Sequence, residues 1–139
     1  MPEAAMPPFA LRGIDHIVLR SADPARLIAF YIEVVGCSLE HEQPKLGLTH
    51  LRAGGQLIDI VDANGPLKKA GDQPVHQPGR NLEHLCLRIE PFDEAALTRH
   101  LASHGISTDP ARNRFGNDGE GPSLYFPDPD GNTIEFKGG

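Results

Sequence analysis

Two hexapeptides repeat one order of residue types, and they constrain the fold more than any other feature of the chain. They are residues 15–20 (DHIVLR) and 83–88 (EHLCLR), and each reads acid, His, apolar, apolar, Leu, Arg. Within each, alternate positions form one consistently apolar face, which is typical of a half-buried β-strand. The two histidines, His16 and His84, occupy the same position on the opposite face. The chain is therefore expected to contain two copies of one structural unit.

Each of these strands is followed by a segment with the pattern of an amphipathic helix. The apolar residues of 25–34 and 94–104 recur with helical spacing and give each segment one buried stripe. The expected capping residues are Asp23 and Asp93 at the starts, and Gly36 and Gly105 at the ends.

Three further strands are predicted after each helix. Those of the first unit are Ser38–Glu42, Gly47–Arg52 and Gly55–Ile60, and those of the second are Ile106–Thr108, Pro122–Phe126 and Gly131–Phe136. Asp59 and Glu135 align in the last strands, and strand alternation places both on the same face as the histidines. The predicted fold is α+β, with two βαβββ modules forming a curved, mostly antiparallel sheet around a cavity.

The domain organisation follows from length and composition. A chain of 139 residues with 39% hydrophobic content can form one compact domain. We expect a flexible tail over residues 1–11 and a single domain over 12–138. Its parts are module one at about 12–63, a Gly- and Pro-containing linker at about 64–80, and module two at about 81–138.

Charge and apolar runs restrict the possible partners. The net charge of −6, with no run of Lys and Arg, argues against nucleic acid and anionic membranes as partners and favours a small-molecule ligand. No apolar run approaches the roughly 20 residues of a membrane-spanning helix. Cys37 and Cys86 lie in apolar strand-like contexts without the spacing of a metal or redox motif. They suit small buried side chains in a reducing compartment, and the expected location is cytoplasmic.

Two histidines and two acids on one sheet face point to a metal ion. A buried carboxylate without a partner costs several kcal/mol, and a cation would supply that partner. Imidazole nitrogen and carboxylate oxygen suit one divalent ion per site, of Zn, Ni, Co, Mn or Fe. The predicted ligands are His16, His84, Glu135 and Asp59. Of the remaining histidines, only His50 is a further candidate.

Three stretches of this sequence resemble the vicinal-oxygen-chelate superfamily. They are Asp15–Ile17, the segment from Phe30-Tyr31 to Val35-Gly36, and Ser123–Glu135 with its Asp-Pro-Asp-Gly-Asn turn. The resemblance extends over about residues 12–138. This superfamily includes glyoxalase I, extradiol dioxygenases, fosfomycin-resistance transferases, methylmalonyl-CoA epimerase and bleomycin-binding proteins. The resemblance implies that His16, His84 and Glu135 are metal ligands, and that Asp59 occupies the fourth ligand position of glyoxalase I.

The reaction depends on Asp59. Glyoxalase I usually has Glu there, and Asp is one methylene shorter. If Asp59 binds the metal, the site suits isomerisation with Asp59 and Glu135 as catalytic carboxylates, as in lactoylglutathione lyase. If it does not, an open triad of ligands fits an extradiol dioxygenase or a thiol transferase. The alternative from another class is a non-catalytic binder of a small molecule, such as an antibiotic, of the bleomycin-resistance type.

Substrate contacts and assembly complete the expectations. The candidate substrate-binding residues are Arg52, Arg112, Arg114 and Tyr125. Residues 109–121 are a candidate lid over the site. Arg20, Arg88 and Lys137 also face the expected cavity and could orient an anionic substrate, although strand-end arginines commonly serve only solvation. The resemblance implies a homodimer, and leaves open whether one chain or two supply the ligands.

Overall fold

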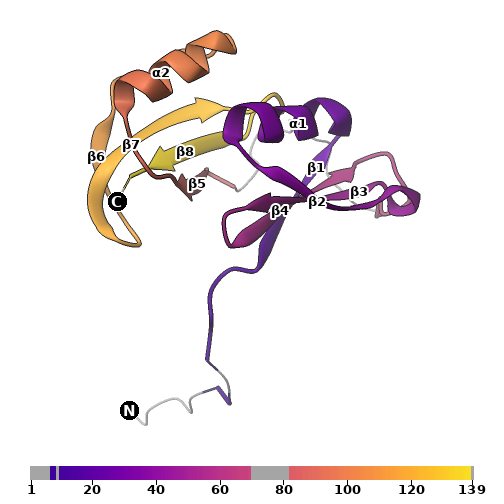
Figure 1. Cartoon of the computed structure of the whole chain (residues 1–139). Helices are drawn as coiled ribbons and strands as arrows, with labels where there is room; N and C mark the ends of the chain where they lie inside the picture. The colour runs from indigo at the N-terminus through magenta and orange to yellow at the C-terminus, as the bar shows by residue number, and fades with distance from the viewer. Residues whose placement is uncertain (1–6, 9, 70–81, 139) are drawn as a thin grey trace.

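The computed structural model describes residues 7–8, 10–69 and 82–138, and within them the chain forms two βαβββ units (Figure 1). The strands of the first unit are β1 (His16–Ser21), β2 (Ser38–Gln43), β3 (Leu48–Ala53) and β4 (Gln56–Asp62). Those of the second are β5 (Leu85–Arg88), β6 (Arg112–Gly116), β7 (Gly119–Pro127) and β8 (Thr133–Lys137). The prediction of two βαβββ units is confirmed.

Each unit has its own four-stranded sheet, and the two sheets have the same topology. Their strand orders are β1-β4-β3-β2 and β5-β8-β7-β6. The pairs β1/β4 and β5/β8 are parallel, and the remaining pairs are antiparallel. The predicted α+β class with mostly antiparallel pairing is confirmed. The strands form two separate open sheets, however, and not one sheet that curves around a single cavity.

The helices begin and end at the predicted capping residues. Helix α1 (Pro24–Phe30) starts where the Asp23 carboxylate accepts a hydrogen bond from the Arg26 amide at 3.2 Å. It continues as a π-helical turn over Tyr31–Val35, which ends at Gly36 with φ of 96°. A side chain there would be strained, so glycine suits this position.

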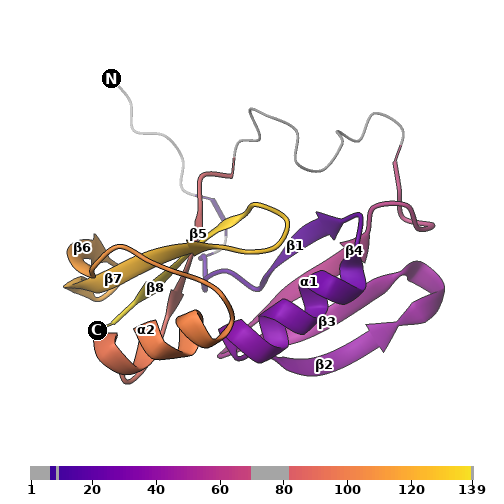
Figure 2. The same ribbon diagram turned by 90° about the horizontal axis from the view of Figure 1, so that it is seen from above.

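Helix α2 (Glu94–Ser103) repeats this arrangement in the second unit. The Asp93 carboxylate accepts from the Ala96 amide at 3.1 Å, and Gly105 follows the helix with φ of 77°. A short 3-10 helix over Pro44–Leu46 connects β2 to β3. Both α-helices lie on the same side of the two sheets, which leaves the opposite faces open (Figures 1 and 2).

The core lies between the helices and the sheets. It includes Leu27 and Tyr31 of the first helical segment and Leu101 of α2, all with no exposed surface. Alternate residues of the strands pack against them, among them Leu19, Ile58, Ile60, Leu124, Ile134 and Phe136. The open faces of the sheets therefore carry the other half of each strand, and these include the predicted ligands.

The sequence prediction placed the second strand of the second unit, which is the first strand after its helix, at the wrong residues. Residues 106–108 have no regular structure, and the strand is β6, at Arg112–Gly116. Pro110 lacks an amide hydrogen and disfavours a continuous strand through this segment. The candidate lid at 109–121 is instead largely a hairpin, in which Gly116 pairs with Gly119 across a two-residue turn. The sequence Asn-Asp-Gly at 117–119 is a hairpin signal that the prediction overlooked.

The Asp-Pro-Asp-Gly-Asn turn near the C-terminus contacts the first helical segment and so joins the two units. Tyr31 donates its hydroxyl hydrogen to the Asp128 carboxylate at 2.7 Å, and the Arg26 guanidinium donates to the Pro129 carbonyl at 3.0 Å. Most of the predicted tail at 1–11 and linker at 64–80, namely residues 1–6, 9 and 70–80, lies outside the described residues. No helix in the described ranges is long and apolar enough to cross a membrane.

Candidate metal and substrate site

The first unit places His16 beside Asp59. The His16 Nε2 atom lies 3.8 Å from an Asp59 carboxylate oxygen, and its Nδ1 atom lies 2.7 Å from the Asp15 carboxylate. Asp59 is only 3% exposed although it is on the open face. The hydrogen bond to Asp15 raises the pKa of His16 above the ordinary 6.5, and Asp59 shifts it in the same direction. A ring held in this way offers Nε2 to a proton or a metal ion.

His50, on β3, holds the other oxygen of Asp59. Its Nδ1 atom lies 2.8 Å from Asp59, and its Nε2 atom lies 2.9 Å from the Gln43 amide nitrogen. An amide nitrogen can only donate, so Nε2 accepts and Nδ1 carries the hydrogen that it donates to Asp59. The ring of His41 stacks against His50 with centroids 5.7 Å apart. The carboxylate of Asp59 is therefore fixed in orientation before any ligand binds.

The second unit repeats the arrangement of His16. The His84 Nε2 atom lies 3.1 Å from Glu135, and its Nδ1 atom lies 3.7 Å from Glu83. Glu135 is 5% exposed, on β8. Tyr125, on β7, packs edge-on against the His84 ring with centroids 5.5 Å apart. In both units, the acid that precedes the histidine contacts Nδ1, and Nε2 faces a buried carboxylate.

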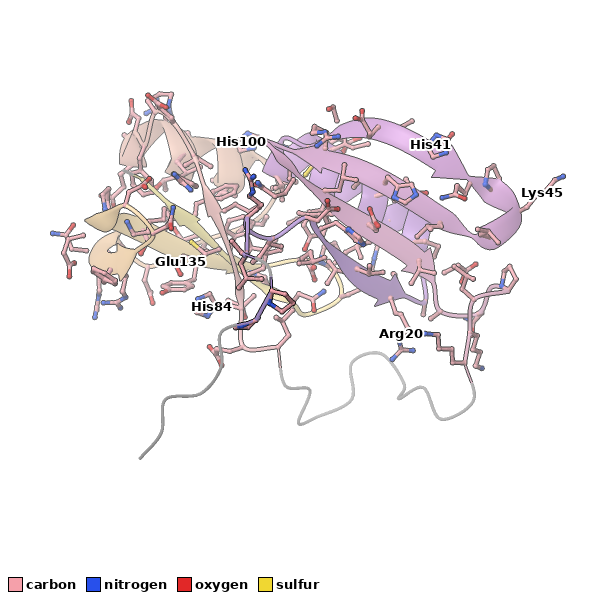
Figure 3. The ribbon with its side chains drawn as sticks, turned by 90° about the horizontal axis from the view of Figure 1, so that it is seen from below. Arg20, His41, Lys45, His84, His100 and Glu135 are labelled. Carbon is pink, nitrogen blue, oxygen red and sulfur yellow. The ribbon has the colours of Figure 1, made fainter. Side chains whose placement is uncertain are left out.

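The four predicted ligands form two separate pairs. Figure 3, which views the open faces, shows His84 and Glu135 on the second unit and His41 on the first. Among the described residues, no three His, Cys, Asp or Glu side chains are grouped so that they could hold a metal ion. One chain thus presents two half-sites, one on each sheet. The expectation of a single concave face that gathers all four is not met, because the strands form two sheets.

The duplicated fold and duplicated half-sites agree with a comparison against known families. A model described as the Glyoxalase/Bleomycin resistance protein/Dioxygenase superfamily matches residues 13–136. The chain belongs to this superfamily. The resemblance identified from the sequence motifs is confirmed.

One relative in the superfamily is similar in both sequence and structure. The virulence protein STM3117 of Salmonella typhimurium is 32% identical over 125 residues, which are 88% of this chain and 81% of that protein. The crystal structure of STM3117 matches with a TM-score of 0.76 and 29% identity, covering 94% of this chain and 98% of that chain. Its name states no reaction, so it leaves the activity of this chain open.

Two proteins whose names state an activity or a resistance share the fold at lower identity. A lactoylglutathione lyase from Agrobacterium tumefaciens matches with a TM-score of 0.65 and 22% identity, covering 93% of this chain and 95% of that one. The fosfomycin resistance protein FosX from Listeria monocytogenes matches with a TM-score of 0.65 and 21% identity, covering 94% and 95%. These matches show a shared fold.

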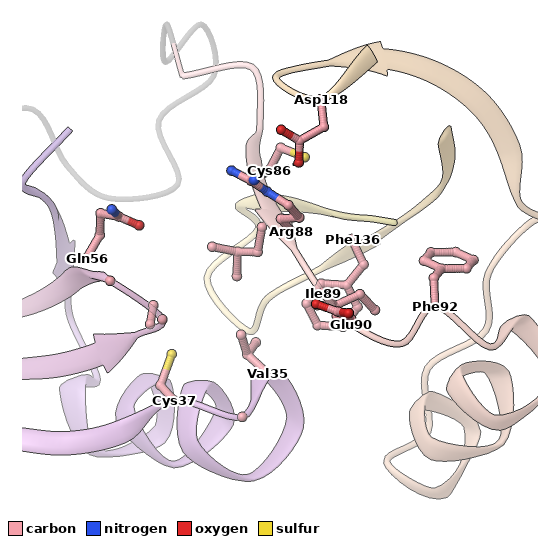
Figure 4. Close-up of a pocket in the computed structure, with 15 residues that line it drawn as sticks. Val35, Cys37, Gln56, Cys86, Arg88, Ile89, Glu90, Phe92, Asp118 and Phe136 are labelled. Carbon is pink, nitrogen blue, oxygen red and sulfur yellow. Dashed lines mark hydrogen bonds and ion pairs between the residues drawn. The ribbon is translucent and has the colours of Figure 1, made fainter. Parts of the chain in front are cut away.

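Two cavities lie near the second half-site. The larger, of about 890 Å³, lies between the units and is lined by the end of the first helical segment, the β3–β4 turn and β5 (Figure 4). It contains none of the four predicted ligands. The smaller, of about 280 Å³, contains both His84 and Glu135. Cys86, Arg88 and Asp118 line both cavities, so the two adjoin. The smaller cavity is therefore the candidate site, since it is lined by the predicted ligands His84 and Glu135.

The predicted substrate-binding residues differ in availability. Arg52 is engaged, because its guanidinium donates to Glu40 at 2.6 Å. Arg112 and Arg114 are exposed on strand β6, within the segment predicted to be a lid. Tyr125 is 37% exposed and lies beside the His84 half-site. Of these four, Tyr125 has the most direct contact with a predicted ligand.

The two cysteines have different environments. Cys37 is buried, as predicted, whereas Cys86 is exposed, because it lies on the open face of β5 opposite Glu135. The sequence prediction did not distinguish them, since both lie in apolar strand-like segments. Partial burial of its thiol, and then the charge of the neighbouring Glu135, raise the pKa of Cys86 to about 11.

The donor set fits a divalent cation. It consists of two imidazoles and two buried carboxylates, and each imidazole is oriented by a second acid. This is the pattern by which acids near metal-binding histidines fix the ring and its tautomer. Sequence reasoning had noted His50 without a role. Its contact with Asp59 follows from the pairing of β3 with β4, in which His50 lies opposite Asp59.

Proposed function

We propose that this protein is a divalent-metal-dependent enzyme that acts on a small oxygenated substrate. The observation that carries the proposal is the duplicated acid–His–acid contact. It links Asp15, His16 and Asp59 in one unit, and it recurs as Glu83, His84 and Glu135 in the other. A protein that only binds a small molecule through apolar contacts has no need of two such sets.

We further propose that one metal site is completed by two copies of the chain. His16 and Asp59 of one copy would face His84 and Glu135 of the other. A homodimer with twofold symmetry would then contain two identical sites. This accounts for two half-sites on separate open sheets within one chain.

The positions of the side chains support a role for each in this proposal. A bound divalent cation would polarise a substrate oxygen and stabilise negative charge that develops on it. Glu135 is buried beside His84 and is the carboxylate best placed to accept or return a proton next to that oxygen. Together these roles support an isomerase or lyase reaction of the lactoylglutathione lyase type.

An open-triad reaction is the second candidate, and the Asp59 contacts favour it. One oxygen of Asp59 already accepts a hydrogen bond from His50, and the other is 3.8 Å from His16 Nε2. An aspartate held in this way can remain outside direct coordination. His16, His84 and Glu135 would then be the ligands of a dioxygenase or transferase.

Metal content measured by elemental analysis tests the proposal. The wild-type protein, prepared without chelator and then reconstituted with each candidate ion, is compared with H16A, H84A and E135A, and with H104A as a control. We expect about one metal per chain in the wild type and in H104A, and loss of metal in the other three. Metal loss in D59A would favour the isomerase reaction, and retention would favour the open triad. Absence of metal after every reconstitution would refute the enzyme proposal and favour a binding module.

Mixed dimers test whether two chains share a site. H16A and H84A chains with different affinity tags are refolded together, and the mixed dimer is isolated through both tags. If each site spans two chains, one of the two sites in the mixed dimer keeps every ligand. The mixed dimer should then bind one metal, while each parent dimer binds none. If each chain forms its own site, the mixed dimer should also bind none.

A further inference from the structure

The smaller cavity contains a buried lysine for which the described part of the chain supplies no carboxylate partner. Lys137, on β8, is 6% exposed and lines this cavity together with Glu135 and His84. Its ammonium donates to the Gly138 carbonyl at 3.2 Å. Within residues 7–8, 10–69 and 82–138, no Asp or Glu forms an ion pair with it. A buried ammonium normally has a counter-charge, because its desolvation is otherwise costly.

The other cations near the site are more solvated or already neutralised. Arg88 lies opposite Lys137 in the sheet, and its guanidinium is 2.6 Å from the Asp118 carboxylate. On the other side of Lys137, Ser123 of β7 lies opposite it, and Arg112 of β6 lies opposite Ser123. Arg112 is exposed. Lys137 is therefore the buried member of a cationic row across the open face of the second sheet.

The surrounding chain holds the lysine stem in place. A Cβ atom added to Gly116, in the β6–β7 hairpin, would lie 2.8 Å from Lys137 Cε and 2.9 Å from Cδ. The stem thus packs directly against the backbone of Gly116. Asp118 draws the turn of the same hairpin toward Arg88, and both line the cavity. The lysine is enclosed by a built pocket and is not a mobile surface side chain.

Lys137 is two residues from Glu135 on one strand, so both side chains are on the same face. Two residues of a strand span about 7 Å. A small molecule with an oxygen at the proposed metal could therefore reach Lys137 with a group a few bonds away. The charge of that group should be negative, because it would supply the counter-charge that the described residues do not give Lys137.

We propose that the cavity of Lys137 is an anion subsite and that the substrate carries a carboxylate, phosphate or phosphonate a few bonds from its metal-binding oxygens. This inference rests on the proposed metal-dependent function for the position of the substrate. It selects Lys137 as the residue that recognises the anion, in place of Arg52, which is paired with Glu40.

Two matched chelators test the subsite in the metal-loaded protein. One is succinate monohydroxamate, which ends in a carboxylate, and the other is the same compound with a neutral primary amide at that end. Their dissociation constants are measured by calorimetry. We expect the wild type to bind the carboxylate compound at least about tenfold more tightly, as for a charge-assisted hydrogen bond.

Two variants isolate the contribution of Lys137. K137M keeps most of the apolar stem and removes the charge, and it should bind the two chelators about equally. G116A keeps the charge but displaces the end of the lysine, and it should reduce the preference. K45Q changes an exposed lysine of the first unit, and this control should keep the preference for the carboxylate chelator. Equal binding of both chelators by the wild type, or an unchanged preference in K137M, would overturn the subsite.

A metal-free arm separates this inference from the proposed function. If the protein holds no metal and binds neither chelator, the metal-dependent function fails. Inorganic phosphate is then titrated into metal-free wild type and K137M, and the backbone amide signals of residues 137 and 138 are followed by NMR. Saturable shifts in the wild type that are absent in K137M would support the subsite. Equal shifts in both, or none in either, would refute it.

Discussion

Replacing Tyr31 with Phe should destabilise the protein through one hydrogen bond that joins the two units. The Tyr31 side chain has no exposed surface, and its hydroxyl donates to an oxygen of Asp128 at 2.7 Å. Phe retains the ring and its edge-on contact with Phe30, whose centroid is 5.8 Å away. The substitution therefore removes the hydrogen bond with little change in packing.

The magnitude follows from the remaining partners of Asp128. A hydrogen bond to a charged acceptor contributes about 1.5–3 kcal/mol. Asp128 still accepts from the amides of Asp130 and Asn132 at 2.9 Å each, and from the Asn132 side chain at 2.8 Å. Because these bonds limit the cost of the lost donor, we expect a loss of about 2 kcal/mol. This corresponds to a decrease in Tm of about 5–8 °C for a chain of this size.

The assay is unfolding by urea and by heat, at one protein concentration. It compares the wild type with Y31F, D128N and the double variant. Y125F is the control, because Tyr125 has no hydroxyl hydrogen bond within the described part of the chain, and its stability should change by less than about 0.5 kcal/mol. A loss below about 0.5 kcal/mol in Y31F, or additive losses in Y31F and D128N, would refute the reasoning.

The same hydrogen bond predicts a dependence on alkaline pH. Burial, and then the charge of Asp128, raise the pKa of Tyr31 far above the ordinary 10.0. The folded state therefore keeps the phenol protonated. The stability that this phenol contributes is complete below pH 10 and declines as the pH rises beyond 10. The stability difference between wild type and Y31F should therefore narrow above pH 10.

Two further predictions concern the half-sites. H50A should weaken metal binding by about 10- to 100-fold, because Asp59 loses the donor that orients it. Metal titration of H50A, with H104A as the control, tests this. Equal metal affinities of the two variants would exclude a role for His50. Cys86 should react with iodoacetamide about 10- to 100-fold more slowly at pH 8 than an ordinary thiol, because burial and Glu135 raise its pKa to about 11. Alkylation should become faster in E135Q, whose loss of charge lowers that pKa, and no acceleration would contradict the proposed contact.

The sequence alone determined the family and the duplicated plan of the chain. The matched hexapeptides, the capping aspartates and the glycines after the helices are local signals, since each depends on residues a few positions apart. For this reason the strand faces of His16, Asp59, His84 and Glu135 were assigned from alternation, and the two helices were placed within a few residues. The strand at 106–108 was wrong because a weak apolar run was preferred to the Asn-Asp-Gly turn at 117–119.

The tertiary structure decided how those residues meet. Sequence alternation assigns a face, but it does not say whether two faces belong to one sheet, and the separation into two sheets divides the predicted ligands into two pairs. The partners of His50, Asp128 and Lys137 also depend on pairings and packing between segments far apart in the chain. Packing also distinguishes the cations. Arg52 and Arg88 each pair with a carboxylate, whereas Lys137 is buried against Gly116 and pairs with no carboxylate among the described residues.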